Sequence, residues 1–208
     1  MRLLAAAAAA VSLLAPAHAA QLIGVVGEVW ESNTTLNNVA QARAAISGNA
    51  VATFDVTAID YPNGDASNST SSNSSLASFL GVDGASIVGT NISELKNTVF
   101  RFSGKIRVDA TGEAWSVGSD DGFELVVDNV VEGAFSNVRG FGTTSGTLDM
   151  APGLYMFELV YFERTGSTGV EFKLNGQIAE NAAVPVPGAA LLMGGVLAAG
   201  AARRKARR

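Results

Sequence analysis

Residues 100–109 read Phe-Arg-Phe-Ser-Gly-Lys-Ile-Arg-Val-Asp, so that apolar or small residues alternate with polar ones. With a repeat of two, Phe100, Phe102, Ile106 and Val108 share one face, and the charged side chains share the other. This alternation predicts a β-strand with one buried face.

Short apolar segments separated by glycine-containing turns continue in both directions from this strand. We expect further strands at 22–30 (an edge strand), 50–59, 114–117, 123–127, 130–131, 147–150, 154–162 and 170–174, with 154–162 central in its sheet because it is apolar on both faces. Short helices are expected near 39–46 and 76–80, and loops at 63–75 and 140–146. No long helical repeat is present. The pattern predicts an all-β fold, a single antiparallel β-sandwich or jelly-roll-like domain.

Both ends of the chain carry targeting patterns. Residues 1–19 combine a basic start, an apolar run and the cleavage motif Ala17-His18-Ala19, which predicts a signal helix removed by signal peptidase before Ala20. Near the other end, an apolar stretch at 188–202 predicts a hydrophobic helix of roughly 22 Å, short for a membrane span. It is preceded by Val184, Pro185, Val186 and Pro187 and followed by a basic cluster that includes Arg203, Arg204 and Lys205.

This tail resembles the C-terminal sorting signals of the Pro-Glu-Pro class. The resemblance implies recognition by an exosortase-like sorting protease, and a plain membrane anchor is the alternative. Residues 20–183 then form the domain, and residues 184–208 form the sorting signal or anchor.

The charge and the residue types of the domain exclude several kinds of function. Six of the 14 basic residues are Arg2 and members of the tail, which leaves eight against 19 acidic residues and a domain charge of −11. An acidic domain is a poor nucleic-acid binder. The chain has no Cys, and its one His is His18. Imidazole-dependent hydrolysis and the usual zinc sites are therefore excluded from the domain, and any metal must be held by oxygen, which favours Ca²⁺.

The segment Gly118-Ser119-Asp120-Asp121-Gly122 is the candidate site. Neighbouring strand residues point to opposite faces, so two convergent carboxylates need an unusual backbone, which the flanking glycines permit. A hard cation would offset the repulsion between the two charges. The alternative is an acidic turn in water.

Residues 99–175 resemble the protective-antigen-type domain of flocculin-related adhesins and many bacterial glycosidases, and are similar to the related fibro-slime domain. The motifs that carry the resemblance are Phe102-Ser103-Gly104, Ser119-Asp120-Asp121-Gly122, Pro152-Gly153-Leu154-Tyr155, Tyr161-Phe162-Glu163-Arg164 and Gly169-Val170-Glu171.

In sugar-binding members of that family, a cis-linked Asp pair holds Ca²⁺, and this implies Asp120 and Asp121 as ligands here. The family's adhesins add an Asn, for which Asn137 and Asn175 are candidates. Trp115 is a candidate sugar-stacking residue, although core packing is its alternative role. We interpret Glu163 and Arg164 as an exposed ion pair.

These observations predict an exported cell-surface or extracellular-matrix protein. Its domain would bind a glycan or a matrix component, with Ca²⁺ as cofactor, and its tail would anchor or sort it. The alternative is a structural surface or biofilm protein without sugar binding, because fibro-slime members keep the Asp-Asp-Gly motif without established sugar binding. We expect no enzyme activity, since glycosidases need carboxylates about 5–10 Å apart across a cleft.

Overall fold

The computed structural model describes residues 21–62 and 68–182. The predicted signal peptide, 1–19, and the predicted C-terminal tail, 184–208, lie outside these residues. No helix within the described part of the chain has the length and hydrophobicity that crossing a membrane requires.

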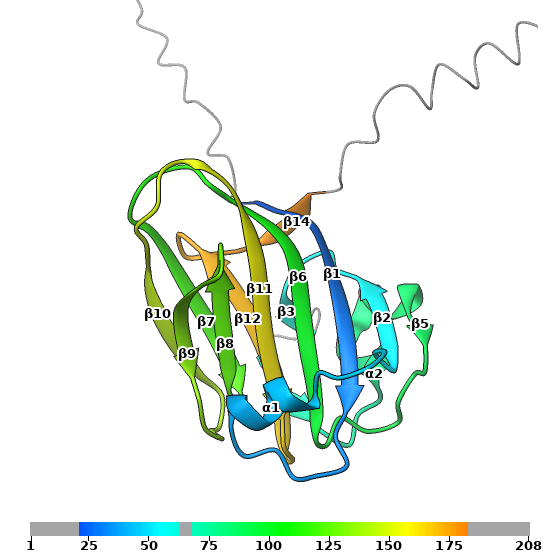
Figure 1. The fold of residues 1–208 in the computed structure, drawn as a ribbon. Helices are drawn as coiled ribbons and strands as arrows, with labels where there is room; N and C mark the ends of the chain where they lie inside the picture. The colour runs from blue at the N-terminus through cyan, green and yellow to red at the C-terminus, as the bar shows by residue number, and fades with distance from the viewer. Residues whose placement is uncertain (1–20, 63–67, 183–208) are drawn as a thin grey trace, which may run out of the picture.

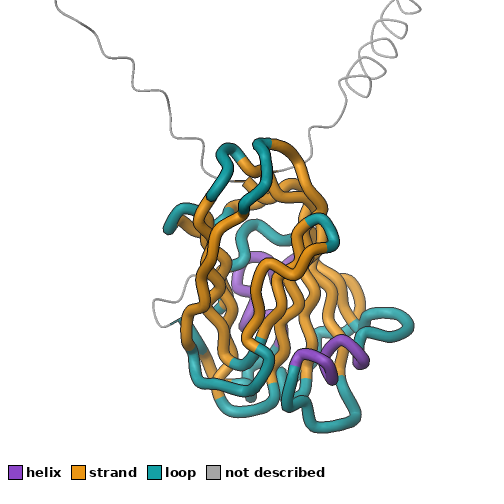
Figure 2. Tube along the Cα trace, turned by 60° about the vertical axis from the view of Figure 1, so that its left-hand side comes forward, coloured by secondary structure: helices purple, strands orange, loops and turns teal. Residues whose placement is uncertain are grey.

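Two β-sheets pack face to face, as Figures 1 and 2 show. The first sheet has the order β5 (Val88–Gly89), β2 (Ala52–Asp55), β1 (Gln21–Glu31), β6 (Thr98–Val108), β11 (Gly153–Glu163), β8 (Phe123–Val127) and β9 (Val130–Phe135), and β14 (Glu180–Ala182) also pairs with β1. The second has the order β10 (Gly142–Leu148), β7 (Glu113–Asp120), β12 (Ser167–Leu174) and β13 (Gln177–Ile178), and β12 also pairs with β3 (Asp60–Tyr61) and β4 (Thr70–Ser71). All described pairings are antiparallel except β1 with β14. The expected antiparallel β-sandwich is confirmed.

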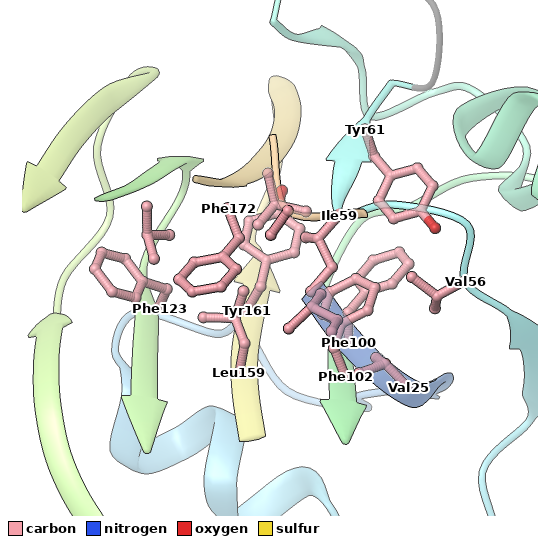
Figure 3. Close-up of a cluster of buried hydrophobic side chains, with 14 of the residues drawn as sticks. Val25, Val56, Ile59, Tyr61, Phe100, Phe102, Phe123, Leu159, Tyr161 and Phe172 are labelled. Atoms are coloured by element: carbon pink, nitrogen blue, oxygen red, sulfur yellow. The ribbon is translucent and has the colours of Figure 1, made fainter. Parts of the chain in front are cut away.

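Alternating apolar residues of the long strands fill the space between the sheets. Phe100 and Phe102 of β6 are fully buried and stack with their ring centroids 6.4 Å apart. Phe157 of β11 meets Phe172 of β12 at 5.3 Å, which joins the two sheets. Figure 3 shows Phe100, Phe102 and Phe172 among the labelled side chains of this core. Burial of these apolar surfaces is the main term that stabilises the sandwich.

Three sequence predictions about individual segments are wrong. Strand β1 lies between β2 and β6 and is not an edge strand. Strand β10 starts inside the predicted loop 140–146, because its Gly146 stands opposite Trp115 and leaves room for that ring; a Cβ there would lie 2.7 Å from the indole. The predicted loop 63–75 contains β4, which pairs with β12.

Two short helices were predicted and are present, together with a 3-10 helix. They are α1 (Val39–Ala45), α2 (Leu76–Leu80) and η1 (Gly81–Ser86). Helix α1 covers the outer face of the first sheet, where Val39 and Ala42 belong to a second buried apolar cluster with Phe162 of β11. Its start also holds the loop that follows β9, since the Val39 N–H donates to the Ser136 carbonyl at 2.9 Å.

The described chain ends lie together. Gln21 of β1 is paired with Glu180 of β14, and Leu22 is paired with Ile106 of β6. Strand β11 ends at Glu163, which pairs with Thr98 at the other end of β6. Ile106 is eight positions after Thr98 in β6, a length of roughly 26 Å.

Candidate functional site

Three carboxylates converge where β7 and β11 end. Asp120 is the last residue of β7, Asp121 follows it, and Glu163 is the last residue of β11. One oxygen from each lies within 4.8 Å of the others. The Asp120–Asp121 peptide bond is cis. Asp120 and Asp121 therefore converge, and Glu163 joins them.

The glycines of the Gly118–Gly122 segment serve a different purpose from the one predicted. Neither of them has a positive φ. Instead, a Cβ on Gly118 would lie 2.6 Å from the Phe141 ring, and a Cβ on Gly122 would lie 2.7 Å from the Asn137 carbonyl oxygen. Glycine is needed because the loop after β9 packs directly on this segment.

Backbone groups hold the Asp121 side chain in place. The N–H of Arg139 donates to its Oδ1 at 3.0 Å, and the N–H of Arg164 donates to its Oδ2 at 2.8 Å. The main chain is held as well, because the Ser119 hydroxyl donates to the Asp121 carbonyl at 2.7 Å and the buried Tyr161 hydroxyl donates to the Asp120 carbonyl. Fixed carboxylates of this kind are suited to holding a ligand.

Glu163 is completely buried, and neither of its carboxylate oxygens has a hydrogen-bond partner among the described residues. The nearby Tyr161 hydroxyl, which tends to lower the pKa of Glu163, donates to the Asp120 carbonyl instead. Burial raises the pKa of Glu163 to about 9, and the charges of Asp121 and Asp120 act in the same direction. The predicted exposed ion pair with Arg164 is wrong, because Glu163 is buried and forms no salt bridge with a described cation.

Burial and mutual repulsion act on the aspartates too. Burial raises the pKa of Asp120 to about 6, and the Asp121 charge adds to the rise. Burial also raises the pKa of Asp121, while the amides of Arg164 and Arg139 limit the increase. Three crowded carboxyl groups, one of them without a donor, are the arrangement that a hard, oxygen-seeking cation would stabilise. The residues present therefore fit Ca²⁺.

An open cavity of about 360 Å³ lies over the aspartate pair. Its lining includes Asp120 and Asp121 together with Arg139, Arg164 and Ser167. Glu163 is not among the lining residues, so it lies on the protein side of the pair. Sequence reasoning missed Glu163, Arg139 and Arg164 as members of this site.

The other predicted residues lie elsewhere. Trp115 is 3% exposed in the main core and stands five residues before Asp120, roughly 17 Å along β7. Its burial fits the alternative role in core packing. Asn175 bonds to Glu113 and Ala114 at the far end of β7. Asn137 is in the loop after β9 and does not line the cavity.

No protein-family model matches the chain, and no curated protein is significantly similar to it. Solved structures do resemble it. The PA14 domain of the antifreeze protein MpAFP has a TM-score of 0.64 and 23% identity, over 76% of this chain and 86% of that one. A PA14 sugar-binding domain from an RTX adhesin has a TM-score of 0.60 and 24% identity, over 76% and 98%.

A third similar structure is more distant in sequence. It is the Epithelial Adhesin 6 A domain from Candida glabrata in complex with Galb1-3GlcNAc, with a TM-score of 0.52 and 13% identity over 78% of this chain and 84% of that one. At these identities the likeness concerns the fold. The chain therefore has the β-sandwich fold that is found in PA14 and epithelial adhesin domains.

Proposed function

We propose that this protein is an exported surface protein whose sandwich binds carbohydrate in a Ca²⁺-dependent manner. The observation that carries the proposal is the cluster of Asp120, Asp121 and Glu163 beneath an open polar cavity. A buried carboxylate without a donor is costly unless it is neutralised or bound to a cation.

The three residues would hold the cation from different sides. Asp120 and Asp121 line the cavity, and their positions are fixed by the main chain around them. Glu163 would contribute from the buried side, where no other described group bonds to it. When bound, Ca²⁺ supplies positive charge and coordination positions that accept sugar hydroxyls.

The similar structures support a glycan as the partner. One is a sugar-binding domain from an RTX adhesin, and another is an epithelial adhesin domain in complex with Galb1-3GlcNAc. The sequence of the two ends supports export and surface attachment, with signal peptidase and an exosortase-like protease as the processing partners and the C-terminal helix as a membrane contact. We propose no catalytic role, because the three carboxyl groups are crowded within 4.8 Å and not separated across a cleft.

Calorimetric titration with Ca²⁺, followed by glycan-array binding in Ca²⁺ and in chelator, tests the proposal. The variant Asp120→Asn should lose the Ca²⁺ heat and the Ca²⁺-dependent glycan signal. Asp128→Asn is the matched control, since Asp128 is exposed in the β8–β9 turn at a φ of 51° that Asn tolerates. No Ca²⁺ heat in the unmodified protein would refute the cation site. Ca²⁺ heat with a silent array would favour the structural matrix role.

A further inference from the structure

Two arginines, Arg139 and Arg164, line the cavity together with the aspartate pair. Arg139 is held rigidly: its Nη2 donates to the Ser119 hydroxyl at 2.8 Å, its Nη1 donates to the Thr144 hydroxyl at 3.1 Å, and its guanidinium lies 4.3 Å from the centre of the Phe135 ring. It therefore contributes a fixed positive charge at the cavity wall.

Arg164 has a different environment. Its backbone N–H bonds to Asp121, but its guanidinium forms no ion pair with any carboxylate of residues 21–62 and 68–182. Arg164 is nevertheless one of the residues that line the cavity. A guanidinium without a carboxylate partner presents a planar fork that can bind an anion through two parallel hydrogen bonds.

The formal charges of the site favour an anionic ligand. Asp120, Asp121 and Glu163 together carry −3 when ionised, and Arg139 with Arg164 carries +2. The net formal charge of these five residues is therefore −1, and a bound divalent cation changes it to +1. A neutral sugar would leave that positive charge without a counter-charge, whereas one carboxylate on the ligand would neutralise it.

We propose that the ligand of this site is an acidic saccharide, a uronate, and that Arg164 is the residue that selects it. The inference rests on the proposed Ca²⁺-dependent sugar binding. In this arrangement sugar hydroxyls face the aspartate pair, and the uronate carboxylate pairs with the Arg164 guanidinium. Arg139 adds attraction without changing its own hydrogen bonds.

The test compares matched sugars by calorimetry in saturating Ca²⁺: glucose with glucuronate, and galactose with galacturonate. We expect one uronate to bind about tenfold more tightly than its neutral partner at low salt, and this advantage to shrink in high salt. Arg164→Gln should remove most of the advantage of the uronate over its neutral partner, because it deletes the guanidinium that pairs with the uronate carboxylate.

The matched control is Arg107→Gln, which makes the same charge change near the opposite end of β6 and should preserve the preference. Equal binding of acidic and neutral sugars, or a preference that survives in Arg164→Gln, overturns the inference while the proposed sugar binding stands. If none of the four sugars binds in Ca²⁺, the proposed sugar binding fails, and this inference fails with it.

Discussion

Replacement of Glu163 by Gln should stabilise the Ca²⁺-free protein at neutral pH. Glu163 is fully buried without a donor, and its pKa is about 9 in the folded protein against an ordinary value of 4.5. Between pH 4.5 and pH 9, the Glu163 carboxyl group has lost its proton in the unfolded chain but keeps it in the folded chain. The free energy of unfolding therefore falls as pH rises, from a maximum below pH 4.5 to a minimum above pH 9.

The size of the effect follows from the difference in pKa. One pH unit within this window changes the free energy of unfolding by about 1.4 kcal/mol, so at pH 7 the ionisation of Glu163 in the unfolded chain costs about 3 kcal/mol of stability. The Gln side chain does not ionise, so the variant does not lose this stability. Glu163→Gln should raise the melting temperature at pH 7 by roughly 6–12 °C, given about 2–4 °C per kcal/mol for a domain of this size.

The assay is urea denaturation in chelator at pH 6.5, 7.5 and 8.5. Asp120, with a pKa of about 6, contributes little to the slope in this range, and the only His of the chain is His18. The unmodified protein should lose about 3 kcal/mol across the range and Glu163→Gln much less. Glu31→Gln, at an exposed position, should keep the full slope. A flat profile in the unmodified protein, or the same slope in Glu163→Gln, would refute the reasoning. In saturating Ca²⁺ the variant should lack the stabilisation that the unmodified protein gains.

Two further predictions concern packing and buried hydrogen bonds. Gly133→Ala should destabilise the domain by about 1–3 kcal/mol in thermal denaturation, because its Cβ would overlap the Trp115 ring. The control Gly140→Ala, at a position with open space around it, should change stability by less than about 0.5 kcal/mol. Equal effects of the two variants would contradict this account. Tyr61→Phe should lower the free energy of unfolding by about 1–3 kcal/mol in urea denaturation, because the Tyr61 hydroxyl donates to the buried Asp83 carboxylate at 2.6 Å. An unchanged free energy of unfolding would show that water replaces this donor.

The long central strands could be predicted because their burial pattern is local. Phe100, Phe102, Ile106 and Val108 are buried as the alternation requires, and β11 lies between β6 and β8 as a strand that is apolar on both faces should. The first part of strand β10 could not be predicted from propensity, since its glycines are typical of loops. Gly146 is explained by its partner in the neighbouring strand, because a Cβ there would lie 2.7 Å from the Trp115 indole.

The site was predictable only in part. The Asp120–Asp121 pair is visible as a motif, but Glu163 and Arg164 together resemble an ordinary surface ion pair. The informative signal was the position of Glu163 in the strand alternation, because it is two residues after Tyr161 and four after Leu159, which are both fully buried. The repeat of two therefore places the Glu163 carboxylate on the core side of β11. Arg139 lies in the loop between β9 and β10, which reaches the site only in the folded protein. No local sequence pattern comparable to that of Glu163 predicts its position.

The pairing of Gln21 with Glu180 has a consequence for orientation. Because the chain enters and leaves the sandwich at one pole, anything joined after Ala182 is joined at that pole. The cavity over Asp120 and Asp121 lies at the opposite pole, roughly 26 Å away along β6. A protein attached to an envelope through its C-terminal segment would thus present its cavity outward, toward a neighbouring cell or polymer, without having to fold back on its own stalk.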